Sequence, residues 1–145
     1  MAYEFFAPKP GRLGVLPQLL AGQCDAAIAN SATTTFNFGG HPARCIANRA
    51  VVSAGTIPVS SGGTILGVIQ KYDASADAAV ALSGNVDLEA LTAHEGTAVT
   101  FLSTLTEAQK TMDSGDTIRF AVTASSTLGT AAVDLTVNVE LLVLE

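Results

Sequence analysis

The fold class is decided by the C-terminal stretch 113-DSGDTIRFAVTASSTLGTAAVDLTVNVELLVLE-145. Apolar and polar residues alternate in it twice, first around Phe120 and then from Val133 to Val143. Successive side chains of a strand point to opposite faces, so each alternation predicts a half-buried strand. We expect the two strands to form a hairpin, with the second as a central strand about 36 Å long. Residues 141–144 are apolar on both faces, which predicts that another subunit covers this end.

The same alternation extends upstream as a series of short segments separated by turn signals such as Ser61-Gly62-Gly63. Many short strands at this spacing are typical of an all-β sandwich or barrel. An immunoglobulin-like domain lacks support because the chain has no Cys…Trp…Cys pattern. We therefore expect a jelly-roll-like antiparallel β-sandwich of about eight strands, with one short helix in 104–112 capped by Thr106. The expected strands are 49–52, 64–70, 78–82, 86–91, 97–102, 117–123 and 132–144.

The sequence predicts two parts, an extended N-terminal arm over residues 1–42 and a β-sandwich over 43–145. Pro8, Pro10 and Pro17 interrupt the first 23 residues, and proline does not fit a helix interior or a central strand. The arm is nevertheless apolar, and 31–38 has the β-branched and aromatic composition of a strand. It is expected to lie on its own domain or on a neighbouring molecule, and the sequence leaves both open.

The composition points to a protein that assembles with others. Hydrophobic residues make up 48% of the chain and charged residues only 14%, against about 25% in typical domains. The uncharged run 50–70 has the length of a membrane span, but glycines and Pro58 break it. Residues 1–10 show no signal-peptide pattern. The net charge is −6 and the seven Lys and Arg residues are scattered, which disfavours nucleic-acid binding.

No pattern for catalysis or metal binding stands out. His41 and His94, the only histidines, are far apart and lie in expected turns. The chain has no Gly-x-Ser-x-Gly motif and no phosphate-binding loop. Cys24 and Cys45 are read as buried thiols or as a disulfide, and two sulfurs alone do not form a metal site. We therefore expect no catalytic residues, no cofactor and no metal.

Two pieces of the chain resemble a known family in the order of their elements. One runs from Ala50-Val51-Val52 to Gly63-Thr64-Ile65-Leu66-Gly67, and the other from Leu105 through Asp113-Ser114-Gly115-Asp116-Thr117-Ile118 to the strand 134–139. This order is similar to that of small jelly-roll decoration (cement) proteins of tailed bacteriophage capsids. The resemblance covers about residues 43–145 and carries no catalytic motif.

The resemblance implies a structural protein that binds the capsid exterior across neighbouring major capsid subunits. It also implies synthesis in the host cytoplasm, location in the virion and a homo-oligomer, with a trimer preferred over a dimer. The alternatives are a carbohydrate- or receptor-binding β-sandwich of a fibre or adhesin, and a minor head or tail completion protein. The apolar residues expected to contact other subunits are Phe5, Phe6, Leu13, Leu16, Leu19, Leu20, Phe36, Phe38, Leu142 and Leu144.

Overall fold

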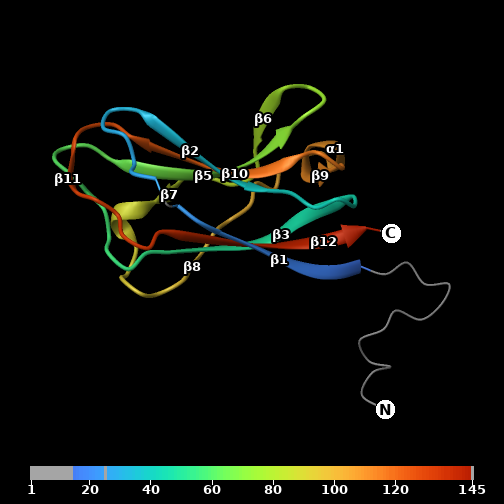
Figure 1. Cartoon of the computed structure of the whole chain (residues 1–145), viewed down its shortest axis with the longest axis horizontal. Coiled ribbons are helices and arrows are strands. Elements are labelled where there is room, and N and C mark those ends of the chain that lie inside the picture. The colour runs from blue at the N-terminus through green and yellow to red at the C-terminus, as the bar shows by residue number, and fades with distance from the viewer. Residues whose placement is uncertain (1–14, 25, 145) are drawn as a thin grey trace, which may run out of the picture.

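The protein folds into two antiparallel sheets that pack face to face. The structure is a computed structural model that describes residues 15–24 and 26–144. Figure 1 shows the two sheets as two layers, with β1, β3 and β12 in one and β2, β5 and β10 in the other. The main strands of sheet A, in spatial order, are β1 (Val15–Gln23), β12 (Thr136–Leu144), β3 (Cys45–Ser53) and β8 (Thr97–Ala98). Those of sheet B are β2 (Thr33–Gly39), β10 (Thr117–Ala124), β5 (Ile65–Asp73) and β6 (Ala78–Ala81).

This strand order is that of a jelly roll. Apart from the β5–β6 hairpin within sheet B, consecutive main strands alternate between the sheets, and the last strand, β12, inserts between β1 and β3. Likewise β10 inserts between β2 and β5. The eight main strands form two four-stranded sheets, as expected for this fold. The expectation of an all-β, jelly-roll-like sandwich of about eight strands is confirmed.

Smaller elements complete the sandwich. β9 (Thr111–Met112) extends sheet A beside β3, and β7 (Val86–Asp87) extends sheet B beside β5. β4 (Val59–Ser60) pairs with β11 (Leu128–Thr130) in a separate ribbon. The short helix α1 begins after Thr106, whose hydroxyl accepts from the Gln109 N–H in a capping box. The helix α1 covers Glu107–Lys110, and a single turn of 3-10 helix, η2 (Leu88–Ala90), follows β7.

The core lies between the sheets and is built by the alternating positions. In β12 every second residue is buried, and in β5 the pattern is the same over most of the strand. Phe120 of β10 is the largest fully buried side chain, and its ring packs against Gly67. The alternation seen in the sequence therefore assigns the inner face of the central strands correctly.

The expected C-terminal hairpin is wrong, because β10 and β12 belong to different sheets. β10 pairs with β2 and β5, whereas β12 pairs with β1 and β3. The connection runs through β11, which is held by β4. Alternation reports which face of a strand is buried, but both sheets bury one face against the same core. It therefore carries no information about the strand's partner.

The described part of the expected arm consists of strands of the sandwich. β1 pairs with β12 along nine residues, and β2 pairs with β10. Pro17 is accommodated because β1 is an edge strand, where one side of the backbone makes no ladder hydrogen bonds. The jelly roll thus begins at β1 rather than at residue 43, and the arm expected for residues 1–14 lies outside the described residues.

Candidate functional site

The outer face of sheet A carries a group of apolar side chains close to its edge. We call Leu19, Ile46, Leu142 and Leu144 the outer strip. The Leu19 side chain is 71% exposed, the highest value among the large apolar residues described as exposed, and the other three are half-buried. Such positions on a sheet face are normally polar when the face meets water. The outer strip is therefore the best candidate for a surface that another protein covers.

The strand register brings these residues together. In β12, Leu142 and Leu144 alternate with the buried Leu141 and Val143, so they point away from the core. Leu142 lies opposite Ile46 of β3, and side chains opposite one another in an antiparallel pair are neighbours on the same face. Leu19 of β1 lies opposite Glu140 and projects from the same outer face. The strip thus crosses three strands at the end of the sheet where β12 ends.

A polar cluster borders the outer strip on the same face. Glu140 accepts hydrogen bonds from Arg49 Nη2 at 2.6 Å and from Asn48 Nδ2 at 2.8 Å. These two hydrogen bonds hold the pKa of the Glu140 carboxyl below its ordinary value. The hydrogen bond to Glu140 in turn raises the pKa of Arg49. A bulge in β3 at this point places Asn48 and Arg49 beside Glu140. The charge nearest the strip is therefore paired within the face.

The strip also adjoins the open edge of sheet A. Among residues 15–24 and 26–144, β1 pairs with β12 on one side only, which leaves a row of backbone N–H and C=O groups without a strand partner from these residues on the other side. An exposed strand edge of this kind is able to pair with a strand from another chain. A partner that covers the outer strip therefore has backbone groups within reach as well as apolar side chains.

The predicted contact residues fall into four groups, of which the first three are described first. Leu19, Leu142 and Leu144 are on the outer strip. Leu16 lies within β1, and only its backbone is described. Phe5, Phe6 and Leu13 lie outside the described residues.

The remaining three predicted contact residues face inward, and this part of the prediction is corrected. Phe36 is a core residue with 7% exposure, while Leu20 and Phe38 pack against the core. The Phe38 ring occupies the space beside Gly22, which joins the two edge strands β1 and β2 across the sandwich. Ile46 was missed because the strand containing it was expected to begin at Arg49. The bulge at 48–49 interrupts the alternation that would have revealed the earlier start.

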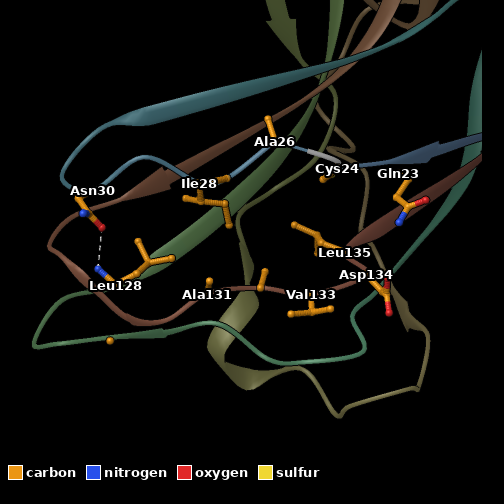
Figure 2. Close-up of a pocket in the computed structure, with 13 residues that line it drawn as sticks. Gln23, Cys24, Ala26, Ile28, Asn30, Leu128, Ala131, Val133, Asp134 and Leu135 are labelled. Carbon is orange, nitrogen blue, oxygen red and sulfur yellow. Dashed lines mark hydrogen bonds between the residues drawn. The ribbon is translucent and has the colours of Figure 1, made fainter.

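A cavity of about 630 Å³ lies between two segments, one formed by residues 23–24 and 26–30 and the other by residues 128–135 (Figure 2). At one end the Leu128 N–H donates to Asn30 Oδ1 at 2.9 Å, and at the other the Cys24 N–H donates to the Leu135 carbonyl at 2.8 Å. Figure 2 shows mainly small apolar side chains along both segments, and the side chains of Ile28 and Leu135 lie between the two segments. The lining contains one thiol, that of Cys24, and one carboxylate, that of Asp134, but it contains no histidine.

The residues considered for chemistry stay apart in the fold. His41 Nδ1 accepts the Ala43 N–H within its own turn, and His94 occupies a turn with positive φ. Burial raises the pKa of the Cys45 thiol, with a smaller contribution from Asp116, and Cys45 is in no disulfide. Within residues 15–24 and 26–144 no three His, Cys, Asp or Glu side chains converge as metal ligands. No helix in the same residues is long and apolar enough to cross a membrane.

No known protein family, curated protein or solved structure matches this chain.

Proposed function

We propose that this protein is a structural virion protein that decorates the exterior of a bacteriophage capsid. In this proposal it binds neighbouring major capsid subunits through the outer face of sheet A and stabilises their association. The observation that carries the proposal is the outer strip, a set of apolar side chains on a sheet face beside an open strand edge. The jelly-roll strand order agrees with the fold that the resemblance to decoration proteins implies.

The energetics favour attachment to several subunits at once. Full burial of one exposed leucine contributes about 1.5–3 kcal/mol, and half-buried residues such as Leu142 contribute less. A stable interface buries about 1,600 Å², which is far more than four side chains supply. The strip therefore serves as an apolar centre that needs surrounding contacts. A decoration protein obtains these surrounding contacts by spanning adjacent subunits. Because the contacts are linked through one molecule, they strengthen overall binding even when the affinity of each single contact stays the same.

The paired charges on the same face fit this role. An unpaired carboxylate beside the strip would lose its hydration when a partner covers the face, and this loss is costly. Glu140 is already hydrogen-bonded to Arg49 and Asn48, so covering it requires little reorganisation. The face therefore combines apolar contact area with a polar cluster that satisfies itself.

The test is to add the purified protein to capsids that lack it and to image the particles by cryo-electron microscopy. The proposal expects added density over the capsid exterior, repeated at equivalent positions that bridge subunits. Density confined to a single vertex would refute decoration and indicate a head-completion role instead. Absence of added density would refute the proposal altogether.

A further inference from the structure

A second feature of sheet A is the weak protection of its edge strand, β1. In the described part of the chain, the side of β1 that faces away from β12 has no strand partner. Natural proteins protect such edges with charged side chains, prolines, bulges or short strands, because an open edge pairs readily with other chains. The sequence of β1, VLPQLLAGQ, runs for nine residues without a charge, and its register with β12 has no shift. Pro17 is the one protective device that β1 contains.

Two hydrogen bonds show which backbone groups of β1 face the open edge. The Cys24 N–H donates to the Leu135 carbonyl at 2.8 Å, in the same register as the pairing of β1 with β12. Hydrogen-bonded positions alternate along an antiparallel pair, so the even-numbered residues of β1 direct their backbone groups toward β12. The other end of β12 agrees, because the Leu144 N–H, opposite Val15, donates to the Arg44 carbonyl on the far side. The odd-numbered residues of β1 therefore direct their backbone groups outward.

Pro17 interrupts this edge at a single position. As an odd-numbered residue it turns its nitrogen outward, so the N–H that proline lacks is missing from the open edge and not from the ladder with β12. Outward N–H groups remain at Val15, Leu19, Ala21 and Gln23, and Pro17 still offers its carbonyl oxygen. The edge of β1 therefore keeps most of its capacity to pair with another strand.

The outward groups are arranged so that β1 matches a second copy of itself. Leu19 is the central residue of the strand, so an antiparallel pair about a twofold axis at Leu19 overlaps all nine residues. In this register Leu19 exchanges hydrogen bonds with the partner's Leu19, Val15 exchanges them with the partner's Gln23, and the Ala21 N–H donates to the partner's Pro17 carbonyl. Every outward N–H thus finds an acceptor, whereas sliding the register either way leaves Val15 or Gln23 beyond the end of the partner strand. We propose that the protein forms a twofold dimer through β1 in this register.

The side chains at the axis favour the same pairing. Leu19 is 71% exposed on the outer face, and in the dimer it lies directly opposite the partner's Leu19, so both leucines lose contact with water. β1 carries no charge that would repel a second copy. The nearest charge across the ladder, Glu140, is already bonded to Arg49 Nη2 at 2.6 Å. A twofold interface requires a patch that is complementary to itself, and β1 meets this requirement in both its backbone and its central side chain.

This dimer has a consequence for the outer strip. The twofold axis of an antiparallel strand pair is perpendicular to the sheet, so the two copies of sheet A form one continuous sheet with both outer faces on the same side. The dimer then presents two outer strips on one surface, and they meet at the axis through Leu19. A surface of this kind engages two capsid subunits at once, a consequence that rests on the proposed function. The dimer itself concerns the isolated protein and does not depend on the capsid role.

The first measurement is the mass of the full-length protein in solution by sedimentation velocity. The proposal expects a species of twice the 14.7 kDa of one chain. The protein concentration is raised to about 100 μM, above the micromolar limit of typical stable interfaces. A monomer at every concentration would refute the proposal. A trimer would also refute it, because pairing about a twofold axis joins two strands only.

The register is tested with Leu19→Lys and Leu19→Glu, because residue 19 lies opposite itself only in the proposed dimer. Each variant alone places two like charges across the axis and removes the apolar contact, so its dimer should dissociate at least about tenfold more readily than the wild type. An equal mixture of the two variants should recover the dimer, since opposite charges then meet at the axis. This recovery also excludes misfolding as the cause of the loss.

The matched control is Gln23→Lys, which places a charge on the same exposed edge. Gln23 lies opposite the partner's Val15, so no like charges meet, and this variant should dimerise within about twofold of the wild type. Unchanged dimers of both Leu19 variants, or a mixture that dimerises no better than either variant alone, would refute the pairing about Leu19. Equal loss of the dimer in Gln23→Lys and Leu19→Lys would contradict the register.

Discussion

Replacing Gly67 with alanine tests the packing between the two central strands of sheet B. Gly67 of β5 is buried, and its position on the strand faces the ring of Phe120, which is fully buried in β10. A Cβ at residue 67 would collide with three ring atoms, and even the farthest, Cε1, would be only 3.1 Å away. Forcing an extra methyl group into a packed core costs about 1–3 kcal/mol. Alanine also restricts the unfolded chain, which returns about 0.4–1 kcal/mol.

The expected net effect is a loss of about 1–2 kcal/mol in the free energy of unfolding, or a fall in Tm of about 3–8 °C. Urea unfolding followed by far-ultraviolet circular dichroism measures it. The matched control is Gly84→Ala, because a Cβ there meets no atom within 4 Å and the backbone does not need positive φ. This control should be neutral or slightly stabilising.

A double-mutant cycle with Phe120→Leu identifies the cause. The smaller side chain removes the ring that collides with the new methyl group, so Gly67→Ala should be much less harmful in the Phe120→Leu background. Residues in direct contact show coupling energies of about 0.5–3 kcal/mol. Equal stability of Gly67→Ala and Gly84→Ala, or strictly additive effects of the Gly67 and Phe120 substitutions, would refute this packing.

Three further predictions concern the polar contacts and the N-terminus. Ser83→Ala should lower the free energy of unfolding in urea by about 1–3 kcal/mol, because the buried Ser83 hydroxyl accepts the Ile69 N–H at 2.9 Å and nothing would replace it. Hydrogen bonds from Ser60 lower the pKa of Glu89, so its stabilising effect is complete above the unfolded value of 4.5 and is lost as the pH falls through the folded pKa. A thermal-unfolding series should therefore show a shallower decline of Tm below pH 4.5 for Glu89→Gln than for the wild type, and parallel curves would contradict this linkage. Deleting residues 1–14 should preserve the cooperative unfolding transition. Deleting residues 1–23 also removes β1, which pairs with β12, and should lower Tm sharply. Equal Tm values for the two deletions would contradict the placement of β1.

The sequence was sufficient for the fold class and for the buried face of the long strands. Alternation along β5, β10 and β12 predicts their inward residues because each has one face against a single core. Strand partners were not predictable in this way, and the hairpin assigned to β10 and β12 was wrong for that reason. Pro17 is a different case, because proline argues against a central strand but is compatible with the edge strand β1.

The candidate surface was predictable only in part. Leu142 and Leu144 stand out because they interrupt the polar positions of an alternating strand. Leu19 and Leu20 are equivalent in the sequence, and only the pairing of β1 with β12 shows that the first points outward and the second inward. Phe36 and Phe38 were expected on the surface because β2 was not assigned to a sheet. Once β2 pairs with β10, these aromatic residues help to close the core.

The proposed binding of capsid subunits by the outer face of sheet A can be tested by comparing Leu142→Lys with Leu66→Lys. Both leucines are half-buried and point outward, the first from β12 in sheet A and the second from β5 in sheet B. In each case the lysine stem retains apolar contact while its charge resists burial, so both variants should fold. The measurement is the occupancy of each variant on capsids that lack the protein, as a function of protein concentration. We expect at least about tenfold weaker binding for Leu142→Lys, equivalent to about 1.4 kcal/mol, and wild-type binding for Leu66→Lys. Equal occupancy of the two variants, or weaker binding by Leu66→Lys alone, would contradict it.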